Sequence, residues 1–259
     1  MTAPAVVPLR RLQGEVALVT GAARGLGRAI AERLHAEGAL VAYWDVDGDR
    51  LAELSAGDGF EGLVDTVDIT DSTAVTAGVA RIRDQLGPVG VLVNNAGISA
   101  PCDPQDVTDE SWRTMMAVNT DAAFWCVRAC LPGMRAARRG KIVNISSIAA
   151  LHGRPATHPA YATSKAALIG MTATLSHNLG PDGITVNAVC PGIIRTEIHE
   201  SYTDEQLAVF FSDIPLVPAG RAGERGLPRD IAAAVAFLAS PDADYITGQY
   251  LEVNGGARP

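Results

Sequence analysis

The sequence has few cysteines, fewer basic than acidic residues, and no long hydrophobic run. None of its four cysteines has the paired CxxC spacing of a metal site, so we predict no bound metal ion. Cys126 and Cys130 would share one helix face, which favours buried thiols and a reducing, cytoplasmic location. The net charge of −8 argues against nucleic acid or an anionic membrane as a partner.

No apolar run approaches the roughly 20 residues of a membrane-spanning helix. The N-terminus also lacks the apolar core of a signal peptide, so we interpret residues 1–11 as a short flexible lead. Hydrophobic residues are nonetheless abundant, at 47% of 259 residues, and suit a well-buried core. With no internal repeat or linker, residues 12–259 are expected to form one domain.

Predicted strands and helices alternate along the chain. Strands are expected near residues 15–20, 40–45, 63–67, 89–93, 141–146, 184–189 and 249–252. Helices are expected near residues 25–36, 48–55, 72–86, 109–134, 160–179 and 229–239. This order predicts an α/β, single-domain Rossmann fold, with a doubly wound seven-stranded parallel sheet and helices on both faces. Ligands of such sheets bind beyond the carboxyl ends of the strands, where the sequence places Asp45, Asp68, Asn94, Ser147 and Pro191.

A glycine-rich turn joins the first predicted strand to the first predicted helix. It reads Thr20-Gly21-Ala-Ala-Arg24-Gly25-Leu-Gly27. Glycines let the backbone turn sharply and approach a pyrophosphate, while the helix N-terminus offers free N–H groups and a favourable dipole. The turn therefore predicts a dinucleotide site, and a tight strand-to-helix turn without a ligand is the alternative.

Asp45 ends the second predicted strand. A carboxylate there can accept hydrogen bonds from the adenosine ribose and would repel a 2′-phosphate, which favours NAD over NADP. Arg24 argues the other way, because an arginine beside the glycine turn could pair with that phosphate. We give Asp45 more weight and predict NAD. The alternative is that Asp45 only caps the turn that follows it.

Tyr161 and Lys165 lie four residues apart, close to one turn of a helix. A free tyrosine has a pKa of about 10, and a nearby ammonium group lowers it. The pair therefore predicts an acid/base that moves a proton on a carbonyl or alcohol oxygen. An ordinary surface helix is the alternative for this spacing taken alone.

With these parts in place, the chain resembles the short-chain dehydrogenase/reductase family from about residue 12 to residue 256. The matching marks are Thr20-Gly21-x3-Gly25-x-Gly27, Asp68, Asn94-Asn95-Ala96-Gly97, Asn119, Ser147, Tyr161-x3-Lys165, Asn187, Pro191-Gly192 and Val253-Asn254-Gly255-Gly256. The resemblance implies an NAD-dependent alcohol dehydrogenase. Hydride would pass between the nicotinamide and a substrate carbon, and the protein would orient and polarise the reactants.

The resemblance also assigns four catalytic residues. Ser147 would hold the substrate oxygen, with Ser146 as the alternative, and Tyr161 would exchange the proton with that oxygen. Lys165 would bind the nicotinamide ribose and keep the pKa of Tyr161 low. Asn119 would support a water relay toward Lys165, and its alternative is a helix-interior amide that binds backbone.

A cofactor site follows from the same resemblance. Asp68 would contact the adenine edge, and the segment from Pro191 to Thr196 would wrap the nicotinamide carboxamide. The predicted cofactor contacts are Gly21, Arg24, Gly25, Leu26, Gly27, Asp45, Val46, Asp68, Ile69, Asn95, Ala96, Gly97, Tyr161, Lys165, Pro191, Gly192, Ile194 and Thr196.

Two segments are expected to build the substrate pocket: residues 149–159 and a lid at about residues 193–226. Both are rich in polar side chains, and an arginine can bind a carboxylate bidentately. Beside Ser147 and Tyr161, the predicted substrate contacts are Arg154, His158 and His199. We therefore predict a small polar secondary alcohol or ketone, such as a sugar, sugar acid or polyol. The alternative is that these side chains face solvent or a subunit interface.

Two other functions stay open. The pattern also resembles NADPH-dependent 3-oxoacyl-[acyl-carrier-protein] reductase-type ketoreductases, which Asp45 disfavours because that group usually uses NADPH. A catalytically inactive dinucleotide sensor is disfavoured by the complete set of Asn119, Ser147, Tyr161 and Lys165. Enoyl reductases of related fold space the tyrosine and lysine more widely.

The resemblance further implies a homotetramer or homodimer. Members of the family commonly pair the helices near residues 109–134 and 160–179 across subunits. The small residues of the second helix allow such close packing. They are equally consistent with packing on the chain's own sheet.

Overall fold

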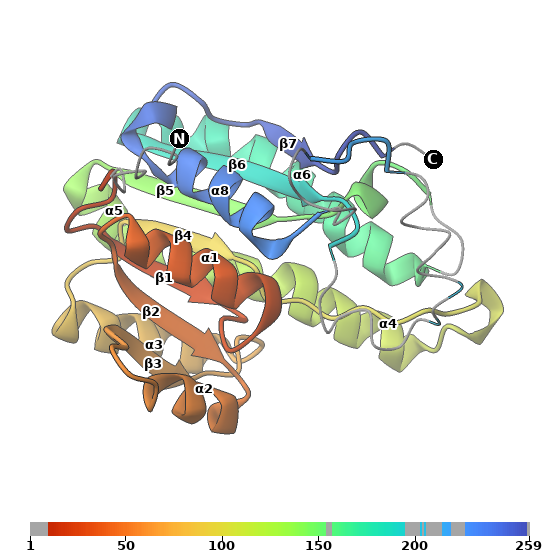
Figure 1. The fold of residues 1–259 in the computed structure, drawn as a ribbon, viewed down its shortest axis with the longest axis horizontal. Helices are drawn as coiled ribbons and strands as arrows, with labels where there is room; N and C mark the ends of the chain where they lie inside the picture. Colours follow the sequence, from red (N-terminus) through yellow and green to blue (C-terminus); the bar gives the residue numbers. More distant parts are fainter. Residues whose placement is uncertain are drawn as a thin grey trace, which may run out of the picture.

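The computed structural model describes residues 10–153, 157–194, 203, 205, 214–218 and 226–257. Seven parallel strands form one sheet in the order β3-β2-β1-β4-β5-β6-β7 (Figure 1). The strands are β1 (Val16–Thr20), β2 (Leu40–Asp45), β3 (Gly62–Thr66), β4 (Val91–Asn94), β5 (Gly140–Ile145), β6 (Ile184–Pro191) and β7 (Tyr250–Val253). All seven predicted strands are confirmed, with ends that shift by one or two residues.

Helices cover both faces of the sheet. They are α1 (Gly25–Ala36), α2 (Gly48–Ser55), α3 (Ser72–Gln85), α4 (Asp109–Met116), α5 (Ala122–Ala137), α6 (Pro159–Leu179) and α8 (Pro228–Ala239). Helices α1 and α8 lie side by side on one face, while α3, α5 and α6 pack on the other (Figure 1). The predicted doubly wound Rossmann fold is therefore confirmed.

The central strands are buried on both faces. Every residue of β1, β4, β5 and β6 is buried, which explains why these strands appear in the sequence as nearly continuous hydrophobic runs. Neighbouring residues then face opposite layers: Leu18 and Leu92 pack in one core, and Val19 and Val93 pack in the other. Cys126 and Cys130 are buried as predicted, and burial raises the pKa of the Cys126 thiol to about 12.

The long helix predicted near residues 109–134 is continuous but changes its hydrogen-bond pattern in the middle. A π-helical segment, Ala117–Asp121, lies between α4 and α5 and carries Asn119 at its centre. Such segments often occur at functional sites, because a wider turn re-aims one side chain. The sequence did not predict this segment, since local helix propensity does not record the tertiary hydrogen bonds of Asn119 and Thr120 to Ser164.

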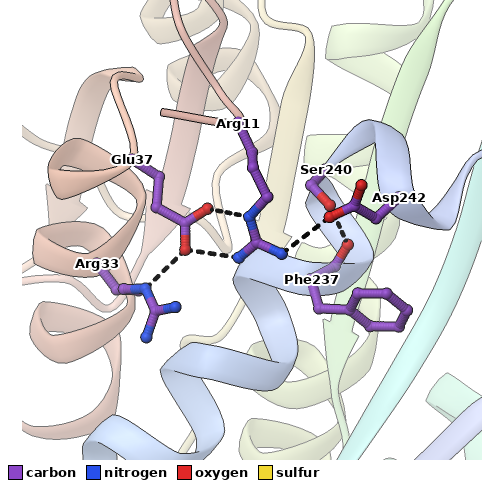
Figure 2. A network of polar contacts seen from close by, with 6 residues as sticks. All are labelled: Arg11, Arg33, Glu37, Phe237, Ser240 and Asp242. Atoms are coloured by element: carbon purple, nitrogen blue, oxygen red, sulfur yellow. Dashed lines mark hydrogen bonds and ion pairs between the residues drawn. The ribbon is translucent and has the colours of Figure 1, made fainter. Parts of the chain in front are cut away.

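An ion-pair cluster around the buried Glu37 ties the start of the described chain to α1 and to the segment after α8 (Figure 2). Glu37 accepts 2.7 Å hydrogen bonds from Arg11 Nε, Arg11 Nη2 and Arg33 Nε, and Arg11 also pairs with Asp242 at 3.2 Å. Burial alone would raise the pKa of Glu37, but the hydrogen bonds from both arginines outweigh it and lower that pKa. Arg11, at the end of the predicted lead, thus holds distant segments together.

None of the helices formed by the described residues is both long and apolar enough to cross a membrane.

Candidate active site

The turn between β1 and α1 depends on glycine at two positions. Gly21 has φ = +65°, and a Cβ atom there would lie 2.9 Å from the Cα of Ala96. At Gly27, a Cβ atom would lie 2.0 Å from the carbonyl oxygen of Gly21, closer than any real contact. The turn can therefore keep this shape only without these side chains, and its backbone stays accessible to a ligand.

The N-terminus of α1 points its free amides toward this turn. Arg24 is the N-cap residue and makes no side-chain capping hydrogen bond, and the first turn contains no acidic residue. The first N–H groups of a helix lack partners within it, and the helix dipole favours an anion beside them. This arrangement fits the pyrophosphate of a dinucleotide.

Side chains behind the turn hold it in place. The hydroxyl of Thr20 accepts hydrogen bonds from the backbone amides of Asn95 and Ala96, both at 3.1 Å. The side chain of Asn95 donates to the carbonyl oxygens of Thr20 at 2.9 Å and of Gly21 at 3.2 Å. The segment after β4 thus supports the turn, and its residues Asn95, Ala96 and Gly97 line the cavity.

Asn94 differs from its neighbours. We expected it at the ligand-binding edge of the sheet, but it is 4% exposed and donates to the side chain of Asn144 at 2.8 Å. Asn144 in turn donates to Thr172 of α6 at 2.9 Å. Asn94 therefore ties β4, β5 and α6 together inside the protein rather than lining the cavity.

A cavity of about 660 Å³ opens at the carboxyl ends of the central strands. It lies where the sheet order reverses between β1 and β4, which is the usual ligand position in such folds. The predicted site residues that line it are Gly21, Arg24, Gly25, Leu26, Gly27, Asp45, Val46, Asp68, Ile69, Asn95, Ala96, Gly97, Ser147, Tyr161, Lys165, Pro191, Gly192 and Ile194. Thr196, Arg154, His199 and most of the predicted lid lie outside the described residues.

Lys165 is buried beneath Tyr161. Its Nζ lies 6.0 Å from the centre of the Tyr161 ring and donates a 2.9 Å hydrogen bond to the carbonyl oxygen of Ile145. Burial lowers the pKa of Lys165 to about 8. The ammonium group is therefore close enough to act on the phenol, and its own charge responds to pH near neutrality.

Ser147 and Ser146 have different surroundings. Ser147 is partly exposed at the cavity wall, and its hydroxyl accepts a 3.1 Å hydrogen bond from the amide of Ala149. Ser146 is 3% exposed and donates to the carbonyl oxygen of Lys165 at 2.7 Å. This geometry favours Ser147 as the group that meets a substrate and gives Ser146 a structural contact.

Asn119 joins three segments around the residues that the sequence predicts to be catalytic. Its side-chain oxygen accepts from the amide of Ile98 at 2.8 Å, and its nitrogen donates to the carbonyl oxygen of Ile98 and to the hydroxyl of Ser164, both at 3.0 Å. A Cβ atom at Gly97 would lie 3.1 Å from Lys165 Nζ and 3.2 Å from Asn119 Oδ1. The two polar atoms thus face the same small space.

The structure does not bring His158 to the cavity wall, although the sequence predicted a substrate contact. Its ring is 3% exposed, Nδ1 accepts from the amide of Ala160 at 3.1 Å, and Nε2 lies 3.3 Å from the hydroxyl of Ser111. Nδ1 is occupied because His158 is the N-cap residue of α6, and Nε2 is occupied by Ser111 of α4. The prediction followed from nearness in sequence, which does not show where a side chain points.

Sequence reasoning missed several residues of the site. Ser164 connects Asn119 to α6, and its only sequence signal is its place inside the Tyr161–Lys165 turn. Four apolar cavity residues were missed as well, because no motif marks them: Trp44, Ile98, Val118 and Ile148.

Comparison with known proteins agrees with this geometry. A family model described as enoyl-(acyl carrier protein) reductase matches residues 21–258. Together with the relatives described next, this match shows that the chain belongs to the short-chain dehydrogenase/reductase family, a family of oxidoreductases.

The relatives are more specific. The chain is 42% identical over 247 residues to 3-oxoacyl-[acyl-carrier-protein] reductase FabG of Haemophilus influenzae, covering 95% of this chain and 98% of the relative. It is 40% identical over 245 residues to the protein of the same name from Vibrio harveyi, again covering 95% and 98%. The Escherichia coli protein of that name is 38% identical over 244 residues, covering 94% and 97%.

These relatives overturn two predictions. Our main prediction of a dehydrogenase for sugars, sugar acids or polyols was wrong, and carbohydrate metabolism is not supported, because the relatives are named as 3-oxoacyl reductases. The prediction of NAD was also wrong, since ketoreductases of this type usually use NADPH.

The structure shows the surroundings of the two residues on which the cofactor prediction depended. Each carboxylate oxygen of Asp45 accepts one backbone hydrogen bond, from Ala23 at 3.0 Å and from Asp47 at 3.1 Å. Asp45 thus caps the local turns and also lines the cavity. The side chain of Arg24 is exposed at the cavity and makes no hydrogen bond or ion pair with any residue that the structure describes.

Proposed function

We propose that the chain reduces a 3-oxoacyl group, carried as a thioester on acyl carrier protein, to the 3-hydroxyacyl group with NADPH. The observation that carries this proposal is the apolar wall around the catalytic residues, since Ile98, Val118, Ile148, Ala149 and Ile193 line the cavity beside them. Such a wall suits a hydrocarbon chain better than a hydroxylated substrate. The names of the relatives support the same chemistry.

Each catalytic residue has one task in this reaction. The hydroxyl of Ser147 donates a hydrogen bond to the 3-oxo oxygen, and the phenol of Tyr161 gives its proton to that oxygen as it becomes an alcohol. The ammonium group of Lys165 stabilises the phenolate that Tyr161 leaves behind. Asn119, which faces the same space as Lys165 Nζ, supports the return of a proton through water.

The lining of the cavity supports a site for the cofactor. The glycine turn and the N-terminus of α1 would hold the pyrophosphate, and the guanidinium of Arg24 would pair with the 2′-phosphate. The segment from Pro191 to Ile194 would contact the nicotinamide, and Val46 and Ile69 would contact the adenine. When bound, NADPH would supply the hydride for the carbon of the 3-oxo group.

Enoyl reduction is a second candidate, because the matching family model carries that description. The four-residue separation of Tyr161 and Lys165 disfavours it, since related enoyl reductases space these residues more widely. The single domain, the lid at about residues 193–226, the homotetramer or homodimer and the cytoplasmic location stay predictions.

A substrate panel tests the proposed function. The purified chain is assayed with acetoacetyl groups on coenzyme A and on purified acyl carrier protein, and with crotonyl thioesters, sugar acids and polyols. Each is tested with NADPH, NADH or their oxidised forms as appropriate. We expect NADPH-dependent reduction of the acetoacetyl thioesters. Activity with crotonyl thioesters alone would favour enoyl reduction, and no activity on any thioester would refute both.

A further inference from the structure

His158 stands three residues before Tyr161 and is the N-cap residue of α6. The amide of Ala160, the second residue of the helix, donates to its Nδ1 at 3.1 Å, and the amide of Tyr161 donates to its backbone carbonyl oxygen at 2.9 Å. Both contacts lie in the first helical turn, which carries Tyr161. The ring of His158 therefore replaces a hydrogen bond that the helix itself cannot make there.

The tautomer of the ring follows from these contacts. Because Nδ1 accepts a hydrogen bond, the proton of the neutral ring is on Nε2. That atom lies 3.3 Å from the hydroxyl of Ser111, which itself donates to the carbonyl oxygen of Thr108 at 2.9 Å. The hydroxyl also accepts from the amide of Thr108 at 3.1 Å, and its second lone pair can accept from Nε2. The bridge joins the start of α6 to the start of α4.

A second bridge lies one turn further along α6. Ser164 accepts from the side chain of Asn119 at 3.0 Å and donates to the carbonyl oxygen of Tyr161 at 2.8 Å. The backbone around Tyr161 is therefore tied on both sides, to α4 through His158 and to the π-helical segment through Asn119. Before His158, residue Thr157 pairs with Pro101 in an isolated bridge, so the chain entering the helix is also held.

We infer that His158 is a positioning residue for Tyr161: its buried ring fixes the first turn of α6 and thereby the place of the phenol. This inference rests on the proposed role of Tyr161 as proton donor. The ring itself lies outside the cavity wall, so it acts only through the helix. A displaced phenol would still leave the cofactor and substrate surfaces in place, so turnover depends on His158 more than binding does.

Three substitutions at one position separate the cap from the rest of the ring. His158→Asn places an oxygen where Nδ1 lies and keeps the cap, because asparagine is a preferred N-cap residue. His158→Gln reaches toward Ser111 but has no acceptor at the Nδ1 position, and His158→Ala removes both contacts. We expect His158→Ala and His158→Gln to lower kcat by about tenfold to hundredfold, the usual cost of a misplaced catalytic group. The kcat of His158→Asn should stay within about threefold of that of the unaltered protein.

The readouts are chosen to distinguish positioning from simple loss of structure. KM for acetoacetyl-coenzyme A and Kd for NADPH should stay within about threefold in all three variants. Hydrogen–deuterium exchange of the segment 157–165 should rise in the alanine and glutamine variants and not in the asparagine variant. Three results would each overturn the inference. They are an unchanged kcat in His158→Ala, a kcat in His158→Asn as low as in His158→Ala, and a loss of NADPH affinity that matches the loss of kcat.

Tyr161→Phe is measured beside these variants. If it retains full activity, the proposed role of Tyr161 fails, while the exchange data still report whether His158 orders the first turn. If it is inactive and the exchange of His158→Ala equals that of the unaltered protein, the proposed function stands and the inference about His158 is wrong.

Discussion

The proposed nucleotide end and the proposed catalytic end of the cavity are built by different means. At the nucleotide end the backbone makes the surface: Gly21 and Gly27 have no room for a side chain, and Thr20 and Asn95 bind backbone amides and carbonyls. At the catalytic end side chains bind one another across α6 and the π-helical segment, as Asn119 and Ser164 do. An added side-chain atom should therefore impair the nucleotide end most. The loss of one polar atom should impair the catalytic end most.

Tyr161→Phe is expected to have the largest effect. Removing the phenolic oxygen deletes the proton donor, and general acid catalysis contributes about 10²–10⁴-fold, so kcat should fall by that factor. Steady-state kinetics with acetoacetyl-coenzyme A measures this, and a fluorescence titration should give an unchanged Kd for NADPH. Tyr245→Phe is the matched control, since Tyr245 is fully exposed and outside the cavity, and should behave as the unaltered protein.

Gly27→Ala tests the backbone-built end. Its Cβ atom would lie 2.0 Å from the carbonyl oxygen of Gly21, so the turn must move. Overpacking costs about 1–3 kcal/mol, and we expect Kd for NADPH to rise by about tenfold to hundredfold. Gly180→Ala is the control, because nothing lies within 4 Å of its Cβ position and its φ of −52° suits alanine. Equal NADPH affinity in both variants would contradict the steric argument.

Arg24→Ala sharpens the cofactor assignment. Hydrogen bonds to charged groups contribute about 1.5–3 kcal/mol, so Kd for NADPH should rise by about tenfold or more. Kd for NADH should not change, because NADH lacks the 2′-phosphate. Arg28→Ala is the control, since Arg28 is one turn along the helix and pairs with Glu32 at 2.7 Å. A parallel loss of NADH binding would show that Arg24 does not read the 2′-phosphate.

The smallest expected effect concerns the buried amine. The folded-state pKa of Lys165 is lowered by burial to about 8 from its ordinary 10.5, so between these values the unfolded chain binds the proton and the folded protein does not. The free energy of unfolding of the unaltered protein, minus that of Lys165→Met, should therefore rise by about 1 kcal/mol between about pH 7 and pH 9. Urea unfolding of the cofactor-free proteins measures this. A difference that does not change with pH would refute the shifted pKa.

Much of the fold could be predicted because its signals are local. The buried strands appear as hydrophobic runs. The turn after β1 is recognisable because its close backbone contacts leave room only for glycine at Gly21 and Gly27. The π-helical segment could not be predicted, because the hydrogen bond between Asn119 and Ser164 joins residues 45 positions apart. The buried place of His158, which we predicted as a substrate contact, could not be predicted for the same reason, since its partner Ser111 lies 47 positions away.

The choice of cofactor shows the same limit at a single residue. An acid at the end of the second strand favours NAD only if no nearby cation offsets it. Asp45 and Arg24 both line the cavity, each oxygen of Asp45 accepts one backbone amide, and these surroundings cannot be read from residue types.

By itself, then, the sequence determined the sheet, its helices and the position of the glycine turn, because hydrophobic periodicity and glycine sterics act over a few residues. The tertiary structure alone decided which polar groups are free to meet a ligand and which are consumed inside the protein. A buried polar atom must find a partner, and that partner generally comes from a distant part of the chain.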